Sequence, residues 1–95
     1  MTVHWTEAAL DDLEGIESFI SAHSEQYARA MVQKIFNRSR ALANLPLLGP
    51  KVPEYGDENL RELVEHPYRI VYRIQDQQVD VVAVVHGARR MPADL

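Results

Sequence analysis

The stretch that most constrains the fold is residues 60–92, where valine, isoleucine and tyrosine dominate three short runs. We predict strands at 60–64, 68–74 and 79–86. His66-Pro67 lies between the first two runs and the polar residues Asp76-Gln77-Gln78 lie between the last two. Connections this short join antiparallel neighbours. A three-stranded antiparallel meander is therefore the simplest topology for this part of the chain.

Arginine recurs within and just after these strands, where a purely structural sheet would use threonine, lysine or valine. Alternation along 68–74 puts the tyrosines and isoleucines on one face and Arg69, Val71 and Arg73 on the other. The run 79–85 is apolar at nearly every position, which predicts a central strand or a groove in which a partner docks. We expect the arginine-bearing face of the sheet to be half open.

Two helices are predicted before the sheet. Thr6 is a candidate N-cap, and apolar residues repeat every three or four positions from about Glu7 to Ala22. Ser24 is a second candidate cap for a stripe that runs to about Asn44. The short joint between the two stripes favours an antiparallel helical hairpin, and residues 2–5 suit an edge strand. The predicted order is β-α-α-β-β-β.

Length and charge limit the possible functions. With 95 residues the chain is predicted to form one domain, residues 1–95. The net charge of −4 argues against a general nucleic-acid binder, which needs an excess of lysine and arginine. Every charge in residues 1–27 is acidic and every charge in residues 28–51 is basic, so we expect the two helices to complement one another.

Several kinds of site are not expected. The chain has no cysteine, and its four histidines lack the spacing of metal ligands, so neither a disulfide nor a metal site is predicted. No cofactor fingerprint is present. No stretch approaches the roughly 20 apolar residues that span a bilayer. We therefore expect a cytoplasmic protein without cofactor or membrane contact, in which Asp11 and Asp12 are solvated charges near a helix start.

Four segments resemble the RelE/ParE superfamily of toxins from type II toxin–antitoxin modules. They are ALDDLEGIESFI, LANLPLLGPKVPE, LRELVEHPYRIVYRI and VVHGARRMP, and together they cover almost the whole chain in order. The resemblance is to the ParE branch, also called plasmid stabilisation proteins. It implies an α+β, RelE/ParE-like fold, in which a helical hairpin packs on one face of an antiparallel sheet.

The ParE resemblance implies a binding protein, not an enzyme, that arrests growth by poisoning DNA gyrase and trapping its cleaved-DNA intermediate. Arginine suits such a role because its planar guanidinium binds carboxylates and phosphates through two parallel hydrogen bonds. The expected target-binding residues are Arg61, Arg69, Arg73, His86, Arg89 and Arg90.

The alternative implied by the superfamily is a RelE-like, ribosome-dependent mRNA endonuclease, and a toxin-fold protein with another target is a third possibility. The nuclease reaction requires a base, an acid and cations around a phosphate. Arg69 and Arg89 match the two arginines of the RelE pattern, but Leu60 and Glu62 occupy its lysine positions and no tyrosine follows Tyr72. If the chain is a nuclease, its expected catalytic residues are Glu62, Arg69, His86 and Arg89.

The resemblance also implies a cognate ParD-like antitoxin, whose disordered segment folds around the toxin in a hetero-oligomer. Two apolar grooves are expected, one on the outer side of the helical hairpin and one on the open side of the sheet. Because the chain is acidic, we expect antitoxin binding to depend more on apolar burial than on charge. The expected antitoxin contacts are Leu13, Ile16, Ile20, Val71, Val82 and Val84.

Overall fold

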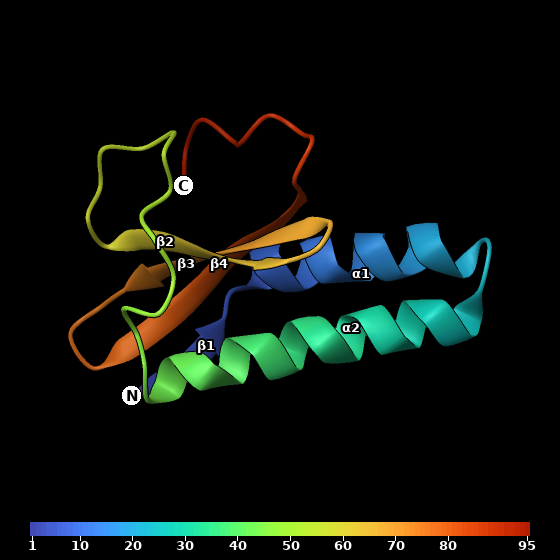
Figure 1. The fold of residues 1–95 in the computed structure, drawn as a ribbon, viewed down its shortest axis with the longest axis horizontal. Coiled ribbons are helices and arrows are strands. Elements are labelled where there is room, and N and C mark those ends of the chain that lie inside the picture. The colour runs from blue at the N-terminus through green and yellow to red at the C-terminus, as the bar shows by residue number, and fades with distance from the viewer.

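The computed structural model describes all residues, 1–95, and has the predicted α+β architecture (Figure 1). A four-stranded sheet has the order β1-β4-β3-β2. Neither of the helices has the length and apolar character of a membrane-spanning segment. The elements are β1 Thr2–Trp5, α1 Glu7–Ser21, α2 Glu25–Arg40, the 3-10 turn η1 Ala41–Ala43, β2 Leu60–Glu65, β3 Tyr68–Ile74 and β4 Gln78–His86.

The sheet pairing confirms the meander and adds one difference. Strands β2, β3 and β4 are consecutive antiparallel neighbours, whereas β1 pairs with β4 in parallel over Thr2–Trp5. Thr6 follows this pairing, and its backbone N–H and its hydroxyl both donate to the carbonyl of Val81 at 3.0 Å. The same hydroxyl accepts from the N–H of Ala9 at 3.1 Å, so Thr6 also caps α1 as predicted.

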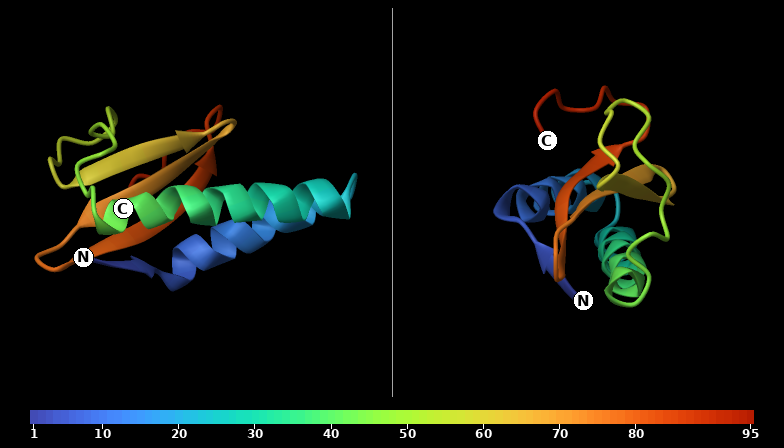
Figure 2. Two further views of the ribbon diagram at one scale, coloured as in Figure 1. Left: turned by 60° about the horizontal axis from the view of Figure 1, so that its bottom comes forward. Right: turned by 90° about the vertical axis from the view of Figure 1, so that its left-hand side faces the viewer.

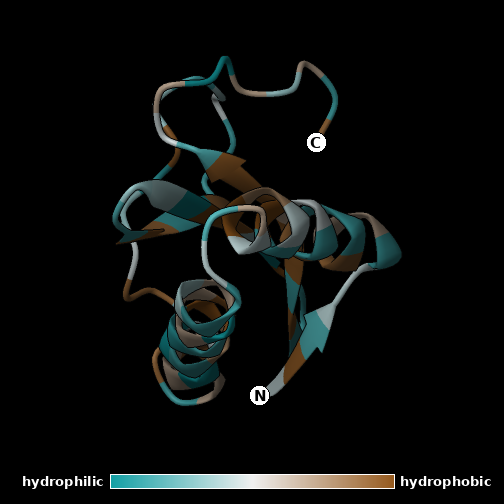
Figure 3. Ribbon diagram, turned by 90° about the vertical axis from the view of Figure 1, so that its right-hand side faces the viewer, coloured by the Kyte–Doolittle hydropathy of each residue, from teal (hydrophilic) through white to brown (hydrophobic).

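The helical hairpin packs on one face of the sheet through apolar side chains, as predicted. Leu13 of α1 and Ile35 of α2 belong to the same buried cluster as Ile70 and Tyr72 of β3. Both helices lie on one side of the sheet and their connection extends beyond it (Figures 1 and 2). Hydrophilic and hydrophobic bands alternate along both helices (Figure 3), which matches burial of one side of each helix.

The expected charge complementarity between the two helices is not realised as ion pairs. None of the five ion pairs of the structure joins α1 to α2; all five involve residues of the sheet or of residues 46–59. Acidic residues such as Glu14 and basic residues such as Lys34 are exposed instead. The hairpin is therefore held by its apolar stripes.

The second face of the sheet is covered over most of its area, which corrects the expectation of a half-open face there, while the end at Val64 remains exposed. From the end of α2 the chain passes the outer edge of β2, where Lys51 forms a β-bridge with Arg61, and residues 52–59 and the tail after β4 lie on the side of the sheet opposite the helices (Figures 1 and 2). A second buried cluster fills the space between, and Val71 at its centre is 0% exposed. Its members are Val52, Leu60, Val71, Ala83 and Met91.

Candidate functional site

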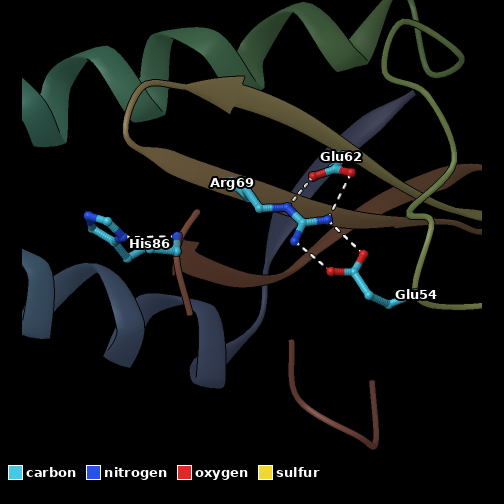
Figure 4. A network of polar contacts seen from close by, with 5 residues as sticks. Glu54, Glu62, Arg69 and His86 are labelled. Carbon is cyan, nitrogen blue, oxygen red and sulfur yellow. Dashed lines mark hydrogen bonds and ion pairs between the residues drawn. The ribbon is translucent and has the colours of Figure 1, made fainter. Parts of the chain in front are cut away.

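Arg69 of β3 lies at the centre of a network of charged hydrogen bonds (Figure 4). Its Nε and Nη2 donate to the two carboxylate oxygens of Glu62 on β2, at 2.5 and 3.0 Å. Its Nη1 and Nη2 donate to the two oxygens of Glu54, at 2.8 and 2.9 Å. The guanidinium thus binds two carboxylates at once, each through two hydrogen bonds.

The network leaves Arg69 little contact with solvent. The side chains of Arg69 and Glu62 are 14% and 9% exposed, whereas that of Glu54 is 42% exposed. The hydrogen bonds from Arg69 lower the pKa of Glu54 to about 2. The hydrogen bonds to Glu54 and then to Glu62 raise the pKa of Arg69 further above its ordinary value. A group of another molecule can therefore reach the guanidinium of Arg69 only by displacing a carboxylate.

Two other expected target-binding arginines are also engaged within the chain. Nη1 of Arg73 donates to the carboxylate of Asp57 at 2.6 Å, and Nη2 donates to the terminal Leu95 oxygen at 2.8 Å. Nη1 of Arg61 donates to the carbonyl of Gly49 at 2.9 Å. These bonds fasten residues 46–59 and the tail to the sheet, which is a structural use of both arginines.

The structure does not bring Glu62 and His86 together. Glu62 pairs with Val71, which belongs to the cluster on the second face, and its carboxylate is bound by Arg69. His86 pairs with Tyr68, which belongs to the cluster under the helices. Paired residues of neighbouring strands share a face, so Glu62 and His86 lie on opposite faces of the sheet, and Figure 4 shows His86 away from the network. The base and acid considered for a nuclease are not assembled.

His86 has the local contacts of a strand-end histidine. Its Nδ1 accepts a hydrogen bond from the N–H of Ala88 at 3.1 Å, and its ring meets that of Tyr68 edge-on with centroids 5.7 Å apart. Arg89 and Arg90 follow, and their side chains form no ion pair. Arg89 lies where two surface cavities meet, one lined by α1 and β4 and the other by Glu54 and the tail. These two exposed arginines are thus available to a target.

Most of the expected antitoxin contacts are interior residues. Leu13, Ile20, Val71 and Val84 are between 0% and 8% exposed, while Ile16 and Val82 are partly buried. The first four are therefore not surface residues, which corrects the expectation that they line an open groove; the antitoxin contacts themselves remain predictions. The buried positions follow from the two-sided covering of β4, because α1 lies on one side of it and the tail on the other.

The exposed aromatic residues of the hairpin were not singled out from the sequence. Phe19 is 71% exposed and Tyr27 is 56% exposed, and both line a groove with His23, Pro67 and Tyr68. Phe19 lies three residues after Ile16 and so at the margin of the buried stripe of α1. That marginal position was the sequence signal that such a residue is exposed.

Asp12 also has a role that differs from the expected solvated charge. Its Oδ2 accepts a hydrogen bond from the backbone N–H of Val84 at 3.0 Å. β1 covers β4 only as far as Val81, so Val84 has no strand partner on that side and the carboxylate takes its place. Burial raises the pKa of Asp12, although the bond from Val84 opposes this rise.

The chain is similar to known toxins along most of its length. Residues 3–91 match the family described as ParE toxin of type II toxin–antitoxin system, parDE. Over 88 residues, 92% of this chain and 96% of the relative, it is 35% identical to Toxin RelE2 of Caulobacter vibrioides.

Two solved toxin–antitoxin structures share the fold. A chain of the chromosomal ParDE system from P. aeruginosa has a TM-score of 0.76 at 21% identity, over 90% of this chain and 95% of that chain. A chain of the toxin–antitoxin complex RelBE2 from Mycobacterium tuberculosis has a TM-score of 0.60 at 25% identity, with the same coverage.

Proposed function

We propose a function from one premise: this chain belongs to the ParE toxin family of type II toxin–antitoxin systems. In the proposed function, the chain arrests growth by poisoning DNA gyrase, so that cleaved DNA accumulates and replication stalls. It acts by binding, without catalysing a reaction itself. A cognate ParD-like antitoxin neutralises it in a hetero-oligomer, in line with the toxin–antitoxin complexes that share its fold.

One observation favours binding over catalysis: the residues that RNA cleavage needs are not gathered at one place. A general base must come within hydrogen-bond reach of the proton that it removes, and a matching acid must stand near the leaving oxygen. Both oxygens of Glu62 are bound by Arg69, and His86 lies on the other face of the sheet. No tyrosine follows Tyr72 to take either role.

A second candidate function is ribosome-dependent cleavage of mRNA. It is favoured by the 35% identity to a relative that is named a RelE toxin. Arg69 and Arg89 match the arginines of that pattern, but in this structure Arg69 is bound to two carboxylates. Cleavage would therefore require that binding to the ribosome rearranges this network.

The deciding experiment follows two reactions in the presence of the purified chain: supercoiling and DNA cleavage by gyrase, and translation of a defined message by ribosomes. The proposed function predicts linear, protein-linked DNA and an intact message. A message cut at the ribosome with unaffected gyrase would establish the nuclease instead. If both reactions are unaffected, the target is neither.

A pair of variants tests the arginines that are free of ion pairs. Replacing Arg89 and Arg90 by alanine should abolish gyrase poisoning and leave the fold intact, because their side chains are exposed and hold no other element. The matched control replaces Arg29 and Lys34 of α2, which removes the same charge from exposed positions on the helices. Equal loss of poisoning in both variants would mean that net charge, not a local surface, decides the effect.

A further inference from the structure

We propose that the outer edge of Arg69 is a carboxylate-exchange site, at which an acidic side chain of a protein partner replaces Glu54. The inference deepens the antitoxin part of the proposed function and is independent of the gyrase target. It follows from the different ways in which the two carboxylates are held, and from the apolar residues beside them.

The two carboxylates bound to Arg69 differ in how firmly the fold places them. Glu62 belongs to β2, is hydrogen-bonded into the sheet next to β3 and is 9% exposed. Glu54 belongs to an irregular segment and is 42% exposed. An exposed ion pair contributes little to stability, because water solvates the separated charges nearly as well. Glu62 is therefore the fixed partner of Arg69, and Glu54 is the exchangeable one.

The surface around Arg69 suits a segment that carries an acid between apolar side chains. The strand register places Val64, Arg69 and Val85 in one row across β2, β3 and β4. Val64 is 56% exposed and Val85 is partly exposed. Directly opposed residues on one sheet face are neighbours, so the guanidinium lies between two apolar side chains. An incoming carboxylate would bind Nη1 and Nη2, and its apolar neighbours would cover the two valines.

Charge favours a carboxylate over a phosphate at this site. Arg69 already faces the permanently placed anion of Glu62, and the whole chain has a net charge of −4. A carboxylate that replaces Glu54 leaves the charge bound to the guanidinium unchanged and repeats the same bidentate geometry. A doubly charged phosphate monoester would add negative charge beside Glu62. A nucleic-acid phosphodiester carries one charge, but it would bring its neighbouring phosphates toward a chain whose net charge is −4. The partner is therefore an acidic protein segment and not a nucleic-acid backbone.

The test measures binding of a short probe peptide to the full chain by NMR, through the Arg69 Nε–H resonance and the backbone amides of Val64 and Val85. The probe is acetyl-Val-Glu-Val-amide, and its control is the same peptide with glutamine. The Glu54→Gln variant removes the competing charge and should bind the glutamate peptide about two- to fivefold more tightly than the wild type. The glutamine peptide should bind each variant with no higher affinity than it has for the wild type.

The matched control is Glu58→Gln, which removes the same charge from the same segment at a side chain 85% exposed and bound to Lys51, not to Arg69. Its affinity for the glutamate peptide should equal that of the wild type. An equal gain in both variants, or no gain in Glu54→Gln, would overturn the proposal. If Glu54→Gln perturbs the fold, Glu54→Asp is used in its place. It shortens the competing side chain and should also bind the glutamate peptide more tightly than the wild type.

A titration with inorganic phosphate tests whether the site prefers a phosphate to a carboxylate. Inorganic phosphate that shifts the Arg69 resonance of Glu54→Gln at lower concentration than the glutamate peptide would overturn the assignment to a protein acid. The gyrase experiment is independent of both arms. Peptide binding without gyrase poisoning would support the exchange site and reject gyrase as the target. Gyrase poisoning without peptide binding would support the target and reject the exchange site.

Discussion

The role of an arginine in this chain depends on which carboxylates lie within reach of its guanidinium. Arg69 has two and Arg73 has one together with the chain terminus, while Arg89 and Arg90 have none. The arginines were predicted to serve one surface. They instead divide into those that stabilise the fold and those that are free of ion pairs. The pH dependence of stability and the effects of single substitutions should show this division.

The bond between Glu54 and Arg69 should make stability depend on acid. The pKa of Glu54 is about 2 in the folded chain, against an ordinary value of 4.5. A carboxyl with a lowered folded pKa stabilises the fold fully above its unfolded pKa and loses this effect as the pH falls toward the folded pKa. Because Glu54 is exposed and water screens its ion pair, the effect is small. The urea midpoint of the wild type should fall slightly more steeply between pH 4.5 and 2 than that of Glu54→Gln.

The control for this pH series is Glu58→Gln, because Glu58 is exposed and does not contact Arg69. It should keep the wild-type pH dependence. If Glu54→Gln also keeps the wild-type dependence, Glu54 is not bound to Arg69 in solution.

Asp12 should be needed as a hydrogen-bond acceptor and not as a charge. Replacement by alanine leaves the Val84 amide without its partner, which costs about 1–3 kcal/mol of unfolding free energy for a buried donor. Asparagine keeps an oxygen at the same place without an ion that burial disfavours, so Asp12→Asn should remain close to the wild type. Denaturant unfolding measures both variants, and Asp11→Ala, at an exposed position, should change stability by less than about 0.5 kcal/mol.

Equal destabilisation by Asp12→Asn and Asp12→Ala would show that the negative charge is what matters.

The sequence predicted neither this bond nor the Arg69 network. Asp12 lies on α1 and Val84 on β4, and periodicity does not tell which helix residue reaches the free edge of a strand. Alternation placed Arg69 and Arg73 on the correct face, but, apart from Glu62 on β2, their partners come from an irregular segment and from the residues after β4. Periodicity carries no information about such segments.

The irregular segment 44–59 is the element that turns a two-layer fold into one covered on both faces. It lies against β2 at Gly49, whose N–H donates to the buried Tyr72 hydroxyl at 3.0 Å and whose carbonyl accepts from Arg61. The Tyr72 hydroxyl in turn donates to the carbonyl of Pro46 at 2.8 Å. A Cβ atom at Gly49 would lie 2.0 Å from the Glu62 carbonyl oxygen, so the close approach requires glycine.

Two glycine substitutions should therefore have opposite effects. Gly49→Ala forces the segment away from β2 and should lower the unfolding free energy by about 2 kcal/mol or more, as for overpacking of a rigid interior. Gly15→Ala, in the middle of α1 with nothing within 4 Å of the new Cβ, should raise it by about 0.5–1 kcal/mol. Urea unfolding of the two variants gives the comparison. An unchanged Gly49→Ala protein would mean that the segment does not rest on β2.

Helices and strands in which apolar residues recur at a regular spacing were predicted well. The pairing of the strands was predicted less completely. The two caps and β3 agree with the structure residue for residue, and the other strands and α1 to within one residue. The second helix ends earlier, at Arg40, and continues as the 3-10 turn η1. The parallel pairing of β1 could not be predicted, because a four-residue strand has no pattern that fixes its direction.

The charge of the whole molecule limits how the proposed gyrase poisoning can work. Three of its arginines are used internally, and the net charge is −4. Non-specific affinity for DNA comes from cations that neutralise phosphates and release counterions. The proposed function therefore requires that a complex of gyrase and DNA is recognised mainly through protein surface, with Arg89 and Arg90 as the local cations.

The free chain should accordingly bind duplex DNA very weakly. At about 150 mM salt we expect a dissociation constant above about 10⁻⁴ M for a labelled duplex in a fluorescence anisotropy titration, the weak end of non-specific binding. A variant with Glu7, Glu14 and Glu17 replaced by lysine shows that the assay can detect binding. These exposed α1 positions change the net charge from −4 to +2, since three replacements add two charges each, and binding should then appear and fall with salt. Tight, salt-sensitive binding by the wild type would instead mean that Arg89, Arg90 and the basic side of α2 form a DNA-binding surface, despite the acidic balance of the chain.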